Sequence, residues 1–230
     1  MWISTSVMAA ILTQERNIRI YDQRVVPAVV LAAGLSTRMG RPKANLPLGE
    51  HDTFLTRIVR TFLDAGVDDV VVVVGYEAEA IASVFGRSGL AARFVHNTEF
   101  ARGQLSSILA GLRAIDRPGI AAMLLTLVDV PLVSAATVRA VIAQHQRTHA
   151  PIVRPTDGAR HGHPVLIDRA VFDALRQADP NTGAKPIVRA HASPAGDLAI
   201  DDEGAFTDVD TPEEYARLSI EHQGHQSAPM

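Results

Sequence analysis

The sequence VVLAAGLSTRMGRPK, residues 29–43, decides the fold that we predict for this chain. The stretch begins inside an apolar run, residues 25–33, that only Pro27 interrupts. The length and the β-branched content of this run are typical of a buried parallel strand. The run ends at Gly34, where small, polar and basic residues follow, so we predict that the strand leads into a loop at this glycine.

The loop after this strand has the composition of a phosphate-binding loop. Gly34 and Gly40 let backbone N–H groups approach phosphate oxygens and adopt positive φ angles. Arg38 and Lys43 supply the positive charge that a triphosphate requires. The loop is not a Walker A motif, because one extra residue separates the glycines, and the dinucleotide motif G-x-G-x-x-G is absent. The alternative is an ordinary strand-to-helix turn, although so long an ordered pattern seldom arises from turn chemistry alone.

The amino-acid composition limits the classes of protein and site. With 230 residues, of which 47% are hydrophobic and 20% charged, the chain can bury one large core, so one domain is the simplest organisation. A formal net charge of -3 and the absence of long basic runs argue against nucleic-acid binding. The chain has no cysteine, which excludes disulfides, thiolate zinc sites, iron–sulfur clusters and cysteine nucleophiles. We therefore expect a cytoplasmic protein.

The two ends of the chain depart from the regular pattern, and we predict a single domain over residues 25–220. Residues 1–24 are an N-terminal extension, which is a loosely ordered arm, an added strand or the result of a start codon assigned too early. Its apolar part, residues 7–12, is too short to span a bilayer, so we expect no membrane partner. Residues 221–230 are polar, and we predict a flexible tail there.

Segments with strand and helix patterns alternate in the first part of the domain. We predict strands at residues 25–33, 70–74, 93–96 and 121–128, and helices at residues 54–63, 77–85, 106–115 and 135–146. This alternation predicts a three-layer α/β/α fold with a Rossmann-like, mostly parallel sheet. The second part is less regular, and we expect it to form a cover over the sheet where an acceptor binds. We predict strands there at residues 150–154, 163–167, 198–200 and 206–209, and helices at residues 169–178, 183–190 and from Pro212 onward.

Three acidic residues are candidates for a metal site. Ligands of open α/β sheets gather at the carboxyl ends of strands, where Asp129 follows the apolar run 121–128. A carboxylate at the end of a buried strand needs a partner, and Mg²⁺, which prefers carboxylates and phosphate oxygens, would supply it. Asp208 and Asp210 lie two apart at a predicted strand end, so both would share one face and complete the site. The alternatives are a turn aspartate at position 129 and helix-capping acids at positions 208 and 210.

Residues 31–43 match the signature L-A-A-G-x-S-x-R-M-G-x-x-K position by position. On these residues the chain resembles the MobA-like nucleotidyltransferases, and within them the molybdenum cofactor cytidylyltransferases. The resemblance covers nearly all of residues 26–218 and implies a sheet of the nucleotide-diphospho-sugar transferase type. It also implies that the signature binds the nucleotide, with Arg38 and Lys43 in catalytic roles. The nucleotide-binding positions that it implies in this stretch are Leu31, Ala32, Ala33, Gly34, Ser36, Arg38 and Lys43.

Three further segments resemble the same family. Residues 97–107, NTEFARGQLSS, are similar to the segment that recognises base and ribose. This likeness implies nucleotide contacts from Asn97, Gly103, Ser106 and Ser107, with helix N-capping by Ser106 as the alternative. Residues 208–214, DVDTPEE, resemble the closing motif, which makes Asp210 the stronger candidate for the second metal ligand. Residues 162–165, GHPV, resemble a segment near the acceptor site in the molybdenum-cofactor branch of the family. The alternative is a structural role, which is more common for a lone histidine. The acceptor-binding candidates of this segment are Gly162, His163 and Pro164.

Together these residues predict a magnesium-dependent transfer of a nucleoside monophosphate from a triphosphate to a phosphorylated small molecule, with release of pyrophosphate. The attacking phosphate is already an anion, so the reaction needs alignment and charge neutralisation rather than a protein base. In the resembling families Ala33 accompanies pyrimidine users, which favours CTP. Molybdopterin as the acceptor, and contact with a molybdoenzyme or a chaperone, follow from the resemblance alone.

Several other functions stay open on the sequence. The transferase alternatives are a guanylyltransferase that uses GTP and a cytidylyltransferase for a sugar or isoprenoid phosphate. A non-catalytic nucleotide-binding accessory protein for molybdoenzyme maturation is another, although the presence of Lys43, Asp129 and Asp210 argues against it. An oxidoreductase is the last, and the missing dinucleotide loop argues against that one.

Overall fold

The computed structural model describes residues 25–224, and the side chains of residues 25–219. The predicted N-terminal extension, residues 1–24, lies outside the described residues, as do residues 225–230 of the predicted tail. No helix within residues 25–224 combines the length and the apolar character that a membrane crossing requires.

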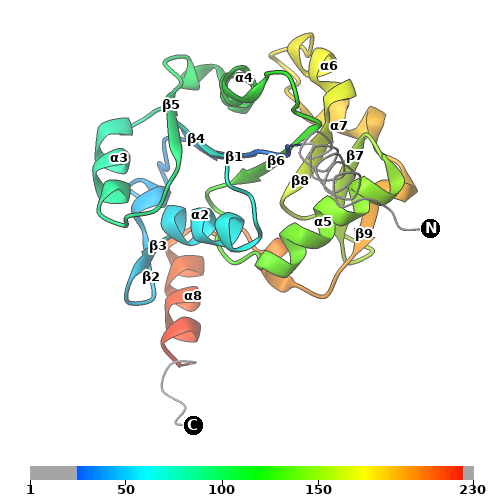
Figure 1. Ribbon diagram of the computed structural model, residues 1–230. Coiled ribbons are helices and arrows are strands. Elements are labelled where there is room, and N and C mark those ends of the chain that lie inside the picture. The colour runs from blue at the N-terminus through cyan, green and yellow to red at the C-terminus, as the bar shows by residue number, and fades with distance from the viewer. Residues whose placement is uncertain (1–24, 225–230) are drawn as a thin grey trace, which may run out of the picture.

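A seven-stranded sheet forms the centre of the molecule (Figure 1). Its strands are, in spatial order, β5 (Arg93–His96), β4 (Val70–Val74), β1 (Ala28–Ala32), β6 (Ala122–Leu127), β8 (Val165–Asp168), β7 (Ile152–Thr156) and β9 (Asp197–Ala199). β8 runs antiparallel to β6 and β7, and the other neighbouring pairs are parallel. The predicted mostly parallel sheet is therefore confirmed, with β1 between β4 and β6.

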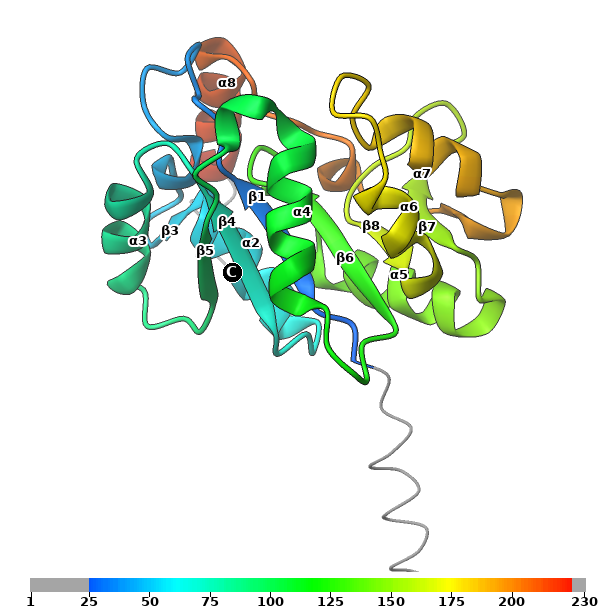
Figure 2. The ribbon, with the colours of Figure 1, turned by 90° about the horizontal axis from the view of Figure 1, so that it is seen from above.

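Helices cover both faces of the sheet (Figure 2). One face carries α2 (Phe54–Asp64), α3 (Ala78–Gly86) and α5 (Ala135–Thr148), and the other carries α4 (Gln104–Ile115), α6 (Phe172–Arg176) and α7 (Lys185–His191). Neighbouring residues of β1 point to opposite faces, because side chains alternate along a strand. Val30 belongs to the core under α2 and α5, and Val29 belongs to the core under α4. The predicted three-layer arrangement is confirmed.

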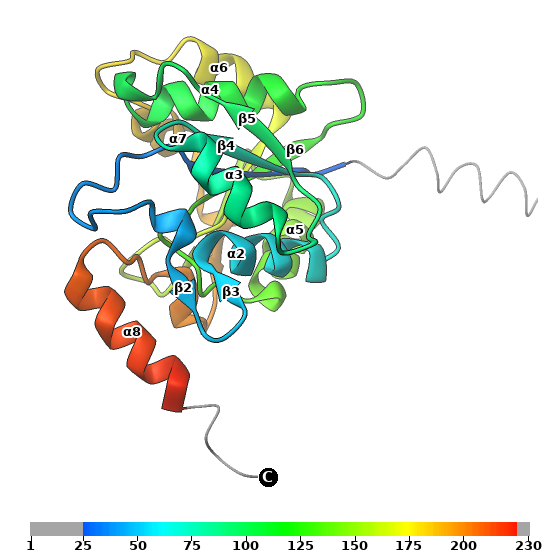
Figure 3. The same cartoon turned by 90° about the vertical axis from the view of Figure 1, so that its left-hand side faces the viewer.

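A hairpin and the last helix lie outside these layers. The hairpin of β2 (Pro47–Leu48) and β3 (Asp52–Thr53) leads into α2, and α8 (Pro212–Gly224) lies beside it (Figure 3). A separate apolar cluster joins the two, and it contains Leu46, Leu48, Phe54, Val209 and Leu218. α8 reaches Gly224, so it continues into the residues that we predicted as a flexible tail.

The predicted strand at residues 206–209 is wrong. These residues follow η5 (Glu203–Ala205) as an irregular connection to α8. Val209 is buried, but its N–H donates to the backbone carbonyl of Asp129 at 2.8 Å instead of joining a sheet. The apolar content of this segment therefore serves the cluster under α8, which local periodicity does not reveal. The remaining short segments are η1 (Lys43–Asn45), η2 (Phe100–Arg102), η3 (Arg169–Val171) and η4 (Pro194–Gly196).

Candidate functional site

A cavity of about 460 Å³ opens at the carboxyl ends of β1 and β6. The loop after β1, the start of α4, the turn after β6 and the segment before α8 all contribute to its lining. The predicted site residues that line it are Leu31, Ala32, Ala33, Gly34, Ser36, Arg38, Lys43, Gly103, Ser107, Asp129 and Asp210. This position agrees with the general location of ligands in open α/β sheets.

The signature loop, residues 34–43, has two turns with positive φ angles. Gly40 has φ 66°, as we predicted, but Gly34 does not adopt a positive φ and has open space where a Cβ would lie. Ser36 takes the left-handed conformation instead, with φ 49°. Its hydroxyl accepts a hydrogen bond from the backbone N–H of Lys43 at 3.2 Å. This bond connects the first turn of the loop to Lys43 at its end.

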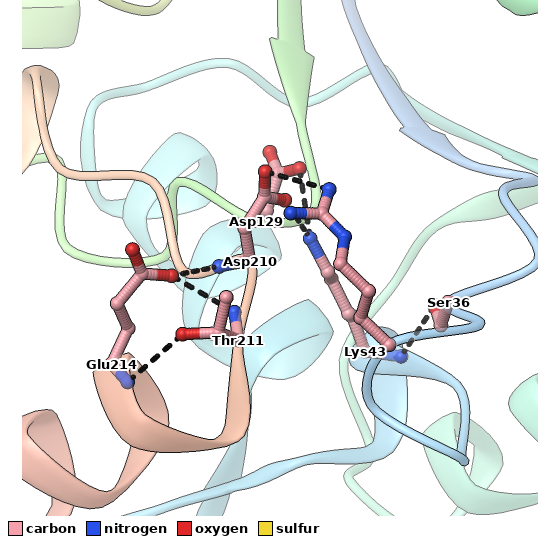
Figure 4. A network of polar contacts seen from close by, with 7 residues as sticks. Ser36, Lys43, Asp129, Asp210, Thr211 and Glu214 are labelled. Carbon is pink, nitrogen blue, oxygen red and sulfur yellow. Dashed lines mark hydrogen bonds and ion pairs between the residues drawn. The ribbon is translucent and has the colours of Figure 1, made fainter.

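The signature loop delivers two cations to two carboxylates. Lys43 is only 9% exposed, and its Nζ donates to Asp129 Oδ2 at 3.2 Å and to Asp210 Oδ1 (Figure 4). Arg38 donates from Nη2 to Asp210 Oδ2 at 3.0 Å. The hydrogen bond from Lys43 is the main cause of a lowered pKa at Asp210, and Arg38 adds to it. Four residues that lie far apart in the sequence therefore form one charged network.

The carboxylate pair fits a divalent cation that takes its other ligands from a substrate. Asp129 Oδ1 is buried and has no hydrogen-bond partner among the described residues, so this oxygen has an unused capacity to accept a ligand. Within the described residues, no group of three or more histidine or acidic side chains is arranged to hold a metal ion. Mg²⁺ is suited to such a site, because it binds through one or two carboxylates together with phosphate oxygens and water.

Asp208, the third predicted metal ligand, is not part of the charged network of Lys43, Arg38, Asp129 and Asp210. Its side chain is exposed, and the residues that line the cavity do not include it. We expected Asp208 and Asp210 to share one face of a strand, but residues 206–209 form no strand, so that argument does not hold. The geometry therefore favours Asp210 as the partner of Asp129.

The segment 97–107 contributes to the cavity through only two of its four candidates. Gly103 and Ser107 line it, whereas Asn97 is 4% exposed and lies behind them. The amide of Asn97 donates to the hydroxyls of Ser106 and Ser107 at 2.9 and 3.0 Å. Ser106 does not cap the helix, because α4 starts at Gln104 and the N-cap residue is Gly103. Asn97 therefore positions Ser107 rather than facing the cavity itself.

The acceptor-side candidates lie outside the cavity lining. The N–H of His163 donates to the carbonyl of Ala205 at 2.8 Å, and the peptide bond between His163 and Pro164 is cis. Burial lowers the pKa of the His163 imidazole, so this ring is neutral near pH 7. These contacts give the segment a structural role, and acceptor binding by Gly162, His163 and Pro164 stays a prediction.

Replacing Gly162 by alanine tests that structural role. A Cβ at this position would lie 2.3 Å from the carbonyl oxygen of Ala205, which belongs to rigid backbone. We expect Gly162→Ala to lower the free energy of unfolding by about 1–3 kcal/mol, the usual cost of overpacking. Urea unfolding measures this change, and Gly86→Ala is the control for a glycine replacement, because Gly86 is exposed at the end of α3, has no positive φ and has open space where a Cβ would lie. Equal stability of Gly162→Ala and the parent protein would contradict the close approach.

Sequence reasoning missed several residues that line the cavity. Phe100, Ala101 and Gln104 contribute from η2 and the first residue of α4. Gly75, directly after the five valines, makes this approach possible, because a Cβ there would lie 2.7 Å from the side chain of Phe100. A glycine at the end of a buried strand was the available signal.

Comparison with known proteins places these residues in a family. The family model for the MobA-like NTP transferase domain matches residues 28–195. Nicotine blue oxidoreductase of Paenarthrobacter nicotinovorans is 33% identical over 205 residues, which cover 86% of this chain and 98% of that protein. Molybdenum cofactor cytidylyltransferase of Escherichia coli (strain K12) is 24% identical over 192 residues, which cover 83% of this chain and 93% of that protein.

A solved structure agrees over the same range. Rv0371c from Mycobacterium tuberculosis H37Rv superposes with a TM-score of 0.70 at 32% identity, covering 85% of this chain and 97% of that one. Its complex with manganese gives a TM-score of 0.64 at 29% identity, with coverages of 85% and 98%.

Proposed function

Because the chain belongs to the MobA-like NTP transferase family, we propose that it transfers CMP from CTP to a phosphorylated acceptor and releases pyrophosphate. The observation that carries this proposal is the charged network, in which Lys43 and Arg38 of the signature loop meet Asp129 and Asp210 in one cavity. A triphosphate needs cations for its oxygens and carboxylates for its metal ion, and the network supplies both.

The two cations of the signature loop would act on the phosphates. When a triphosphate enters, Lys43 and Arg38 exchange their carboxylate partners for phosphate oxygens, which are also charge-assisted acceptors. Lys43 then stabilises the charge that develops on the α-phosphate, and Arg38 stabilises the leaving pyrophosphate. The acceptor phosphate attacks as an anion, so the protein contributes alignment and no base is required.

Asp129 and Asp210 would hold a magnesium ion in the same complex. The unpartnered Oδ1 of Asp129 is available from the start, and Asp210 becomes available when its two cations turn to the phosphates. When bound, the ion neutralises phosphate charge and fixes the direction of displacement. The manganese complex of Rv0371c supports a divalent cation in a relative of this fold.

The choice of CTP depends on the end of β1. Ala33 lines the cavity beside Gly34, and its methyl group narrows the space for a purine more than a glycine would. The relative named molybdenum cofactor cytidylyltransferase supports CTP with a molybdenum-cofactor acceptor, and a probable molybdenum cofactor guanylyltransferase of Mycobacterium avium keeps GTP as the alternative. We also propose that the reaction takes place in the cytoplasm. The protein would contact a molybdoenzyme or a chaperone when the finished cofactor is delivered.

The experiment for this proposal is nucleotide-dependent pyrophosphate release. We expect release with CTP, Mg²⁺ and molybdopterin, and a thermal shift with CTP and Mg²⁺ that exceeds the shifts with GTP, UTP and ATP. If GTP is the only nucleotide that supports pyrophosphate release, the protein is a guanylyltransferase and the assignment as a cytidylyltransferase is wrong. No release with any of the four nucleotides, although one of them binds, would favour a non-catalytic accessory protein.

An oxidoreductase is a second candidate, because nicotine blue oxidoreductase is 33% identical over almost its whole length. The signature loop lacks the glycine pattern that binds a dinucleotide, and its two cations face carboxylates. We therefore expect no saturable binding in a titration with NADPH. Binding of NADPH at micromolar concentrations together with failure of the CTP assay would make the oxidoreductase the better assignment.

A further inference from the structure

α8 contacts the signature loop at several points that the proposed reaction does not use. The helix lies beside the β2–β3 hairpin (Figure 3). Leu218 and Tyr215 belong to its apolar contact with the body. Met39, from the middle of the signature loop, packs against the same cluster. The loop and the last helix of the domain therefore share one small core, although more than 160 residues separate Met39 from α8 in the sequence.

The first turn of α8 fixes the backbone that carries Asp210. Glu214 Oε2 accepts hydrogen bonds from the N–H groups of Asp210 and Thr211 at 2.7 and 2.8 Å (Figure 4). Thr211 Oγ1 accepts in return from the N–H of Glu214 at 3.2 Å, so the pair forms a reciprocal cap. The two backbone hydrogen bonds lower the pKa of Glu214, which keeps the carboxylate ionised for this role. Val209 N–H, bonded to the carbonyl of Asp129 at 2.8 Å, connects the same segment to the other carboxylate of the site.

Tyr215 holds the other side of the signature loop. Its hydroxyl donates to the carbonyl of Pro47 at 2.9 Å, and its ring meets Phe54 edge-on at a centroid distance of 5.8 Å. The guanidinium of Arg41 lies over this ring, 5.7 Å from its centroid. Such a cation–π contact is attractive, and Arg41 is a residue of the signature loop. A ring anchored on the hairpin therefore supports a cation of the loop.

We infer that α8 holds the signature loop in its nucleotide-binding conformation, with Glu214 and Tyr215 as positioning residues. Glu214 fixes Asp210, which pairs with Arg38, and Tyr215 fixes Arg41. The loop contains two glycines and three long cationic side chains, so ordering it carries an entropic cost that these contacts offset before the nucleotide arrives. The consequence for catalysis rests on the proposed function, whereas the consequence for loop order does not.

Hydrogen exchange of the unliganded protein tests loop order directly. We expect amide exchange in residues 34–42 to become about tenfold faster in Glu214→Ala, in line with the usual effect of losing a helix cap. In Tyr215→Leu the same peptides should exchange about two- to fivefold faster, as expected for loss of a cation–π contact. Glu213→Ala is the matched control, because Glu213 is exposed and makes no side-chain hydrogen bond among the described residues. Unchanged loop exchange in both Glu214→Ala and Tyr215→Leu would overturn the inference.

Two further variants separate positioning from a general loss of stability. Tyr215→Phe keeps the ring under Arg41 and loses only the hydrogen bond to Pro47. Its loop exchange should therefore be slower than in Tyr215→Leu and close to that of the parent protein. Arg41→Gln removes the loop side of the contact and leaves α8 untouched, and it should speed loop exchange as much as Tyr215→Leu does. If Arg41→Gln leaves loop exchange unchanged, the contact does not hold the loop and the inference fails for Tyr215.

Kinetics connect the loop to the proposed reaction. For a positioning role we expect the KM for CTP to rise about tenfold in Glu214→Ala, while the KM for the acceptor stays within about twofold, because only the nucleotide depends on loop order. Equal rises in both constants would contradict a role specific to the loop. If the parent protein shows no transfer at all, the proposed function fails, and the exchange measurement still decides the role of α8.

Discussion

Lys43→Ala is expected to lower the rate of nucleotidyl transfer by about 100-fold or more, because a preorganised cation at the developing phosphate charge contributes that much in other enzymes. Lys43 is the most buried member of the charged network, and it alone contacts both carboxylates. Neither water nor Arg38, which is largely exposed, would replace its charge at the same point. The measurement is the single-turnover rate of pyrophosphate release at saturating CTP and Mg²⁺.

The same replacement removes the partner of Asp129, so stability needs its own control. With Lys43 gone, two partly buried carboxylates would face each other, and we expect a loss of about 1–2 kcal/mol in the free energy of unfolding. The double variant Lys43→Ala with Asp129→Asn removes the uncompensated charge and should recover most of that loss, yet it should stay inactive. Near-normal turnover of the double variant would show that the network has only a structural role, and it would contradict the proposed function.

Asp129→Asn is expected to reduce turnover by about 100-fold or more at a fixed Mg²⁺ concentration, because an amide oxygen is a weaker ligand for a hard cation than a carboxylate. The asparagine keeps the shape of the side chain and an acceptor for Lys43, so the fold should be preserved. A titration of turnover against Mg²⁺ is the measurement, and a shift of the midpoint to higher concentration is the expected signature. The matched control is Asp64→Asn, an exposed position at the end of α2 on the surface.

The same titration decides which acid is the second metal ligand. We expect Asp210→Asn to shift the Mg²⁺ midpoint more than Asp208→Asn, because Asp210 lines the cavity and Asp208 does not. A larger shift for Asp208→Asn would reverse the assignment. A normal midpoint in Asp129→Asn would remove this aspartate from the metal site.

The layers of the fold could be predicted from short apolar runs in the sequence, without knowledge of distant contacts. The apolar run before Gly34 and the five valines at residues 70–74 are both buried strands of the sheet. A segment that is apolar on both faces has few stable places outside a covered parallel sheet, so the prediction did not depend on distant contacts. The prediction for residues 206–209 failed for the opposite reason, because Val209 is buried in a cluster with Leu46, Leu48 and Phe54, which come from a distant part of the sequence.

The site shows the same division. The residue types and the spacing of the signature loop indicated a phosphate site, and the strand-end positions of the acids indicated a metal site. The resemblance added residues 97–107 and favoured Asp210 over Asp208. Sequence alone did not reveal that Asn97 supports Ser107 from behind, or that Phe100 and Gln104 line the cavity. The position of Phe100 depends on its close approach to Gly75, and no pattern within one element records a contact between two elements.

The sequence by itself determined the α/β/α class and the glycine-bracketed, cationic character of residues 34–43, because strand burial, glycine placement and side-chain charge are local properties. Only the tertiary structure decided which carboxylates meet Lys43, and that Asp210 rather than Asp208 faces the cavity. It also decided that α8 contacts the signature loop. The physical reason is that ion pairs and apolar contacts form between side chains brought close by the packing of whole elements, and this packing depends on the entire chain.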